Sequence, residues 1–101
     1  MFLVVFRNRK RADINAAAYA ADAAQMERLA AAQPGFRSFK SYTAEDGEMV
    51  AISEWADEAA ARAWGTVEEH RCVQQKGRAE YYRDYTLFAC DLPRIHRFVS
   101  S

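Results

Sequence analysis

The segment from residue 69 to residue 82 holds the densest group of side chains that could take part in chemistry. His70, Gln74, Gly77 and Tyr81 follow one another at spacings of four, three and four residues, so they share one face of a helix. This face is polar and aromatic, and Gly77 leaves a gap in it. Packed towards a sheet, such a face can line a pocket for a small molecule. It can equally hold a half-buried structural histidine beside a close helix contact.

The elements around this face follow from the spacing of apolar residues. Alternation of apolar and polar side chains predicts strands, and recurrence at three and four residues predicts helices. We expect Asp13 to cap the first helix and Asp57 the second, because a carboxylate there accepts hydrogen bonds from free backbone amides. The Glu45-Asp46-Gly47 sequence predicts a tight hairpin turn. The predicted strands cover residues 2–9, 36–43, 48–55 and 82–91, and the predicted helices cover residues 14–32, 58–64 and about 68–79.

The order of these elements is strand, helix, strand, strand, helix, strand. It predicts an α+β fold of the ferredoxin-like (split βαβ) type, with a four-stranded antiparallel sheet covered by helices on one face. The other face keeps apolar residues, and an apolar patch of that size usually marks an interface, so we expect a homodimer formed sheet against sheet. The sequence shows no linker. We therefore expect a single domain over residues 1–101, with a core of 2–91 and a C-terminal tail of 92–101.

The composition argues against several classes of function. Fourteen basic residues balance fourteen acidic ones, so a nucleic-acid partner is not expected. The longest apolar run, residues 2–6, is far shorter than the roughly 20 residues of a membrane span. The four glycines fit neither a dinucleotide fingerprint nor a phosphate loop. The two cysteines form no paired motif, so we expect no disulfide framework and no metal site.

A basic cluster, Arg7 to Arg11, comes directly after the apolar start of the chain. A signal peptide has the opposite order, with its positive charge before the apolar stretch, so we expect a cytoplasmic protein. The basic cluster could bind an anionic ligand or act as a localisation signal. As a run of charge, it is more simply interpreted as the solvated end of a strand.

Short motifs are spread along most of the chain. In the second half they are Ser53-Glu54-Trp55, Ala63-Trp64, Glu69-His70-Arg71, Gln74, Gly77-Arg78, Tyr82 and Asp84-Tyr85. In the first half they are Val4-Val5-Phe6-Arg7-Asn8-Arg9, Pro34-Gly35-Phe36 and Phe39-Lys40. Together, over roughly residues 2–91, the chain resembles the antibiotic biosynthesis monooxygenase domain family.

This resemblance implies a dimeric α/β barrel and a class of activity. Some similar proteins oxygenate aromatic polyketides without flavin, haem or metal. We therefore expect a cofactor-independent monooxygenase that uses dioxygen on an aromatic or polyketide-like small molecule. Without a cofactor, the substrate must supply the electrons. A deprotonated phenol or hydroquinone can reduce dioxygen by one electron, so the protein need only bind the ring away from water, assist deprotonation and stabilise the anion.

Within that chemistry, we expect His70 to take the proton or to stabilise the anion, because histidine titrates nearest to neutral pH. Asn8, at the end of the first strand, could orient a carbonyl or a peroxide, or it could bond to nearby backbone. Aromatic rings and hydrogen-bonding groups would hold the substrate. The side chains that we expect to do so are Trp64, Gln74, Tyr81, Tyr82 and Tyr85.

Other functions stay open. Similar proteins of this fold cleave haem with an asparagine on the first strand and a tryptophan and a histidine on the helices. Asn8 and Trp64 match that pattern in kind, but His70 follows Trp64 too closely for the haem ligand, and Gln74 would ligate iron poorly. A non-catalytic small-molecule-binding or regulatory dimer is another possibility, because a fold does not define a function. A structural dimer with a filled core would exclude every ligand.

Overall fold

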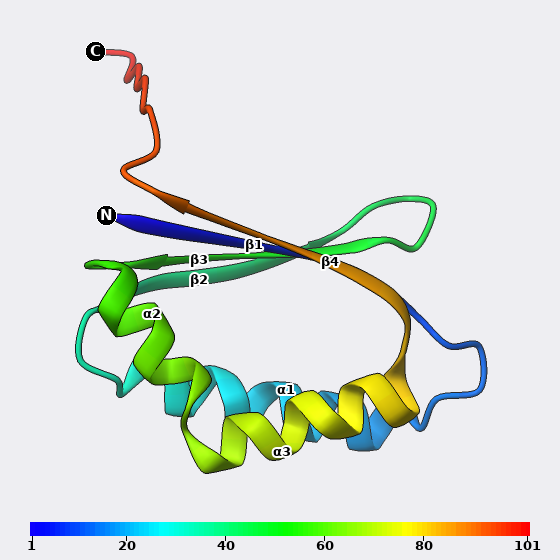
Figure 1. Ribbon diagram of the computed structural model, residues 1–101. Coiled ribbons are helices and arrows are strands. Elements are labelled where there is room, and N and C mark those ends of the chain that lie inside the picture. The colour runs from blue at the N-terminus through cyan, green and yellow to red at the C-terminus, as the bar shows by residue number, and fades with distance from the viewer.

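The computed structural model describes the backbone of residues 1–101 and the side chains of all of them except Glu68 and Glu69. Its four strands form one antiparallel sheet in the order β2-β3-β1-β4. The helices lie against one face of this sheet (Figure 1), so the predicted α+β, ferredoxin-like fold is confirmed. The elements are β1 (Phe2–Lys10), α1 (Ala16–Ala31), β2 (Phe36–Thr43), β3 (Met49–Trp55), α2 (Glu58–Gly65), α3 (Glu68–Lys76), the π-helical turn η1 (Gly77–Tyr81) and β4 (Tyr82–Asp91).

An asparagine, not an aspartate, begins α1. The side-chain oxygen of Asn15 accepts a hydrogen bond from the backbone N–H of Ala18 at 3.0 Å. The expected Asp13 cap is therefore wrong, because Asp13 lies in the preceding turn and the helix starts at Ala16. The Asp57 cap of α2 is confirmed, since its carboxylate accepts from the Ala60 N–H at 2.8 Å.

The strand register decides which side chains of β1 face the helices. Phe2 lies opposite Trp55, and both are buried in the core with Ala30 of α1. Because side chains alternate along a strand, every second residue from Phe2 points to the same side. Asn8, which lies opposite Met49, therefore also faces the helices.

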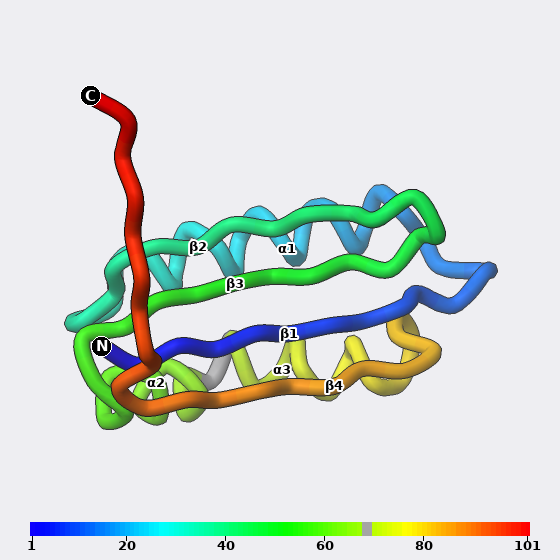
Figure 2. Tube along the Cα trace, turned by 90° about the horizontal axis from the view of Figure 1, so that it is seen from above, coloured from blue at the N-terminus to red at the C-terminus, as the bar shows by residue number. Residues whose placement is uncertain are grey.

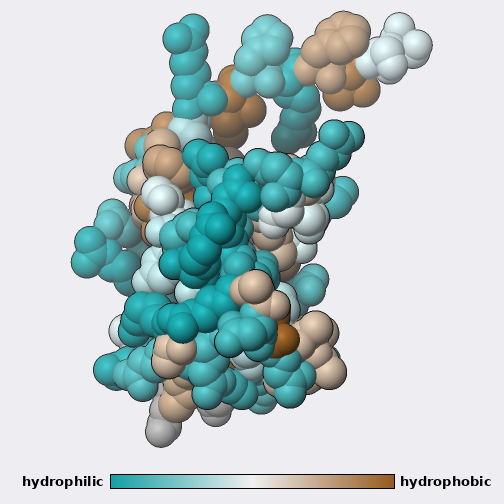
Figure 3. All heavy atoms as spheres, turned by 90° about the vertical axis from the view of Figure 1, so that its right-hand side faces the viewer, coloured by the Kyte–Doolittle hydropathy of each residue, from teal (hydrophilic) through white to brown (hydrophobic). Residues whose placement is uncertain are grey.

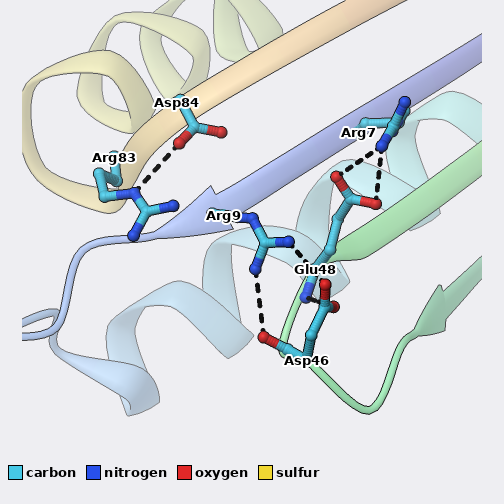
Figure 4. A network of polar contacts seen from close by, with 6 residues as sticks. All are labelled: Arg7, Arg9, Asp46, Glu48, Arg83 and Asp84. Carbon is cyan, nitrogen blue, oxygen red and sulfur yellow. Dashed lines mark hydrogen bonds and ion pairs between the residues drawn. The ribbon is translucent and has the colours of Figure 1, made fainter.

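The opposite face of the sheet is open, with ion pairs at one end and a group of apolar side chains beyond them, among which Lys40 and Glu54 also lie. At the charged end, Arg7 donates to both carboxylate oxygens of Glu48 at 3.1 and 3.0 Å, and Arg9 donates to Asp46 at 2.7 Å (Figure 4). The alternation assigns the apolar part of this face to Leu3, Val5, Val50, Ile52 and Phe88.

The C-terminal tail, residues 92–101, leaves the sheet on the open side and extends away from it (Figures 1 and 2). Its apolar side chains Ile95, Phe98 and Val99 are 61%, 84% and 77% exposed. In Figure 3, brown spheres of the tail stand clear of a mainly teal body. The tail thus carries apolar surface that its own chain does not bury.

The helix expected over residues 68–79 ends early. Regular helix stops at Lys76, and a wider π-helical turn, η1, follows from Gly77. A Cβ at Gly77 would lie 2.7 Å from the ring of Tyr82, so the missing side chain allows this ring to pack against the turn. The turn then places Tyr81 in the interior and starts β4 at Tyr82.

Candidate active site

Two groups of chemistry-bearing side chains lie on the helix side of the sheet. The first, here called the Lys10 cluster, brings together β1, β3, β4 and α1. The second, here called the His70 cluster, lies towards the end of the sheet where β1 begins. The Lys10 cluster consists of Asn8, Lys10, Tyr19, Met49 and Tyr82, and the His70 cluster of Trp55, Trp64 and His70.

Asn8 is almost completely buried, with 1% of its surface exposed. Its Oδ1 atom accepts a hydrogen bond from the Nζ atom of Lys10 at 2.6 Å. An ammonium group can only donate, so this bond identifies the amide oxygen and fixes the orientation of the Nδ2 group. Among the described atoms, Nδ2 has no hydrogen-bond partner. A buried donor without an acceptor costs about 1–3 kcal/mol, so its presence requires an explanation.

Lys10 brings a positive charge to the same place. Its Nζ atom lies 4.6 Å from the centre of the Tyr19 ring and 5.7 Å from that of the Tyr82 ring, within the range of cation–π attraction. No ion pair found among the described side chains includes Lys10. Burial lowers the pKa of its ammonium. The expectation of a solvated strand end is wrong for this residue, because the alternation of β1 turns its side chain under the sheet.

The two tyrosines of the Lys10 cluster stay protonated at neutral pH. Burial raises the pKa of both Tyr19 and Tyr82, since a phenolate would lose its hydration there. The Tyr19 hydroxyl lies 3.9 Å from the sulfur of Met49. The Lys10 cluster is therefore rich in hydrogen-bond donors and carries a net positive charge.

Aromatic rings connect the Lys10 cluster to solvent along β4. Phe6 contacts Tyr82 and Tyr85, with ring centres 5.4 and 5.2 Å apart. Tyr85 and Leu87 belong to the helix side of β4, because they lie opposite Asn8 and Phe6 of β1. They are nevertheless 41% and 53% exposed. The helices thus leave this side of β4 uncovered, and a flat molecule could reach the cluster along it.

His70 is held in one tautomer by the backbone. Its Nδ1 atom lies 3.0 Å from the carbonyl oxygen of Trp64, which can only accept, so Nδ1 carries the hydrogen and Nε2 has a free lone pair. The imidazole stacks on the Trp64 ring, with centres 4.2 Å apart and planes 12° apart. Burial lowers the pKa of His70, and the bond to Trp64 offsets this only in part. The ring is therefore neutral at pH 7.

The structure does not join the two clusters into one compact pocket. Helix α3 separates them, because seven residues lead from His70 to Gly77, a rise of about 10 Å. Gly77 in turn contacts the Tyr82 ring of the Lys10 cluster. No hydrogen bond or ring contact between the clusters occurs within the described set of side chains. A ligand touching both would have to extend along α3.

Two of the expected substrate-binding residues have other surroundings. Gln74 is exposed on α3. Tyr81 is 3% exposed, and its hydroxyl donates to Asp22 of α1 at 2.6 Å. Lys76 also pairs with Asp22, at 3.2 Å. Tyr81 thus connects α1 to η1, whereas Trp64, Tyr82 and Tyr85 lie in or beside the two clusters.

Three members of the Lys10 cluster, Lys10, Tyr19 and Met49, were not among the expected site residues. A signal for Lys10 existed in the sequence, because it continues the alternation of Phe6 and Asn8. Tyr19 and Met49 reach the cluster only through the packing of α1 and β3 against β1. No spacing along the chain reveals that contact.

A surface hollow of about 420 Å³ lies apart from most of these residues, at the start of α1 and the end of η1, and its walls include Arg11, Asn15 and Lys76. In the described part of the chain, no three His, Cys, Asp or Glu side chains gather as a metal site would require. Likewise, none of the described helices combines the length and apolar character needed to cross a bilayer.

Solved structures share this fold. A putative antibiotic biosynthesis monooxygenase from Deinococcus radiodurans has a TM-score of 0.83 at 10% identity, over 99% of this chain and 100% of that one. A variant of SnoaB, a cofactor-independent oxygenase from Streptomyces nogalater, has a TM-score of 0.77 at 20% identity, over 93% and 94% of the two chains. At such identities the likeness establishes the fold.

Sequence comparison goes further. The uncharacterized protein YqjZ of Bacillus subtilis is 31% identical over 97 residues, which cover 96% of this chain and 83% of that protein. The family model for antibiotic biosynthesis monooxygenase matches residues 1–76, which is most of the chain. The chain belongs to the antibiotic biosynthesis monooxygenase family.

Proposed function

We propose that this protein is a monooxygenase that uses dioxygen to oxidise an aromatic small molecule without a cofactor. Its family supports this proposal, as does the shared fold of SnoaB, a cofactor-independent oxygenase. The observation that carries it is the state of His70. The Nδ1 hydrogen is engaged by the Trp64 carbonyl, so a neutral imidazole presents Nε2 as a proton acceptor.

The reaction begins with proton transfer from a phenolic substrate to Nε2 of His70. The Trp64 carbonyl stabilises the resulting imidazolium, because it keeps its bond to Nδ1–H. The phenolate then gives one electron to dioxygen. The two radicals combine to a peroxide anion, which takes the proton back from His70 and then loses water. Overall, a substrate SH₂ and O₂ give SO and H₂O, so the substrate supplies all the electrons.

The substrate ring would lie along the uncovered side of β4. In this proposal an extended, polycyclic substrate reaches both clusters: Trp64 contacts the end that gives its proton to His70, and Tyr82 and Tyr85 contact the other end, where the Nδ2 group of Asn8 donates to a carbonyl or peroxide oxygen. Gln74 and Tyr81 would have secondary roles, since the first is exposed and the second is bonded to Asp22.

We also propose a homodimer formed through the open face of the sheet. Its apolar side chains have no cover from their own chain, and Phe88 is 50% exposed. The tail projects from the same side with further apolar side chains (Figure 1). A second copy of the chain would bury both surfaces, as exposed apolar patches generally require.

Oxygen uptake with a panel of dihydroxynaphthalenes tests the role of His70. We expect His70→Ala to lower the uptake rate by about a hundredfold or more, as loss of a general base usually does. His96→Ala is the matched control, because His96 lies in the exposed tail. Equal rates in the native chain and His70→Ala would reject the assigned role. Tight binding of panel members without any uptake would favour a non-catalytic binding dimer.

A further inference from the structure

The free hydrogen-bonding capacity of the Asn8–Lys10 pair consists mainly of donors. The one acceptor atom, Oδ1 of Asn8, is already bonded to Lys10 at 2.6 Å. Both hydrogens of the Asn8 Nδ2 group are unpaired within the described structure. Nζ of Lys10 has two further hydrogens, for which the structure offers the sulfur of Met49 at 3.4 Å and two aromatic ring faces.

We propose that Asn8 and Lys10 bind an anionic oxygen of an aromatic ligand, which makes the site selective for aryl oxyanions over neutral aromatics of the same shape. If the ligand is the substrate of the oxygenase, the proposal rests on the proposed function. The binding preference itself does not depend on that function. Lys10 is a specificity-determining residue, because it supplies the charge. Asn8 supplies the directed hydrogen bond.

The chemistry of the surroundings selects this class of ligand. A buried donor needs an acceptor, and a lysine without a described carboxylate partner makes an anionic acceptor the best match. Phe6, Tyr82 and Tyr85 offer ring faces beside the pair, with centres 5.2 to 5.9 Å apart. The remaining carbon skeleton of the ligand would therefore be aromatic.

The chain contains a matched control for the charge of Lys10. Nζ of Lys40 also lies over a tyrosine ring, 5.7 Å from the centre of Tyr42. Lys40, however, is an exposed residue of β2 on the open face of the sheet, opposite Ile52. Replacing either lysine by methionine removes one positive charge from a lysine–tyrosine contact. Only the Lys10 replacement alters the proposed site.

The test compares 2-naphthoate with 2-naphthamide, which have similar shapes and differ in charge at pH 7. Calorimetric titration of the native chain should show naphthoate binding about tenfold or more tightly than naphthamide, since a charge-assisted hydrogen bond adds at least that factor. Lys10→Met should abolish this preference, because it should weaken naphthoate binding far more than naphthamide binding. Lys40→Met should preserve it. In NMR spectra of the native chain, naphthoate should shift the side-chain NH₂ signals of Asn8.

Asn8→Asp is the second variant. It places a carboxylate beside Lys10. The positive charge of Lys10 is then already paired, so naphthoate should bind more weakly although Lys10 is still present. Failure of the native chain to bind naphthoate, equal affinity for the two ligands, or unmoved Asn8 signals would each overturn the proposal. These outcomes are independent of oxygen uptake. Uptake without charge preference rejects this inference alone, and charge preference without uptake rejects the oxygenase alone.

Discussion

At the level of single residues, the imidazole of His70 makes the stability of the fold depend on pH. Its pKa in the folded chain lies below the ordinary 6.5, chiefly because of burial. The contribution of the neutral His70 ring to the free energy of unfolding is fully present above pH 6.5, the ordinary pKa. As the pH falls below it, the unfolded chain takes up a proton before the folded chain does, so stability is lost by at most about 1.4 kcal/mol per pH unit.

Urea unfolding at about pH 7.5 and about pH 5 measures this linkage. The free energy of unfolding should fall more steeply between the two pH values for the native chain than for His70→Gln. His96→Gln should follow the native chain, because its site lies in the exposed tail. Parallel curves for the native chain and His70→Gln would mean that His70 is not buried in solution.

The contact between the η1 turn and the Tyr82 ring requires a residue without a side chain at Gly77. In Gly77→Ala the new methyl group would meet the Tyr82 ring at 2.7 Å, so we expect a loss of about 1–3 kcal/mol in stability from overpacking. Gly65→Ala is the control, since nothing lies within 4 Å of a Cβ there. Urea unfolding of the two variants makes the comparison. An equal effect at both positions would contradict the tight contact with Tyr82.

The sequence predicts the members of the site better than their arrangement. His70 lies in α3, as its spacing predicts, whereas Gly77 lies in the η1 turn, where the ring of Tyr82 fills the expected gap. The spacing does not reveal the separation between His70 and Asn8, which depends on how α3 packs along the sheet. Lys10 escapes notice because its four basic or polar neighbours hide the strand alternation within a run of charge. The burial of Lys10 depends on the packing of α1 over β1, which the sequence does not show.

At the level of elements, α1 tests how well local signals predict a helix start. Asn15→Ala should cost about 1 kcal/mol, because the Ala18 N–H loses its acceptor. Asp13→Ala should change the unfolding free energy little, since Asp13 is an exposed turn residue. The reverse order of effects in urea unfolding would restore Asp13 as the cap.

Strand boundaries follow closely from alternation, and the four expected strands match β1 to β4 to within one residue at each end. The end of α3, in contrast, does not follow from the sequence pattern. A π-helical turn is wider than an α-helical turn and contains an extra residue. The spacing of apolar residues before and after the turn does not show this insertion. The signal available is Gly77, whose need becomes clear only from the Tyr82 ring that packs on it.

At the level of the whole molecule, β4 provides a direct test of the proposed homodimer. Phe88 and Leu87 are neighbours with similar exposure, 50% and 53%, but they point to opposite faces of the sheet. In light scattering, the native chain should have about twice the mass of one 11.5 kDa copy. Phe88→Glu should shift it to the single mass, and Leu87→Glu should leave it unchanged. Dissociation by Leu87→Glu alone would place the interface on the wrong face.

The uncovered side of β4 has a consequence for how two such subunits would respond to ligand. In the proposed binding mode a ligand approaches the Lys10 cluster past Tyr85 and Leu87 on the helix side, whereas the proposed pairing uses the other side of the sheet. Occupancy of one subunit then does not block the entrance of the other. Saturation curves should accordingly be hyperbolic, and a mixed dimer with one disabled subunit should retain half the capacity of the intact pair.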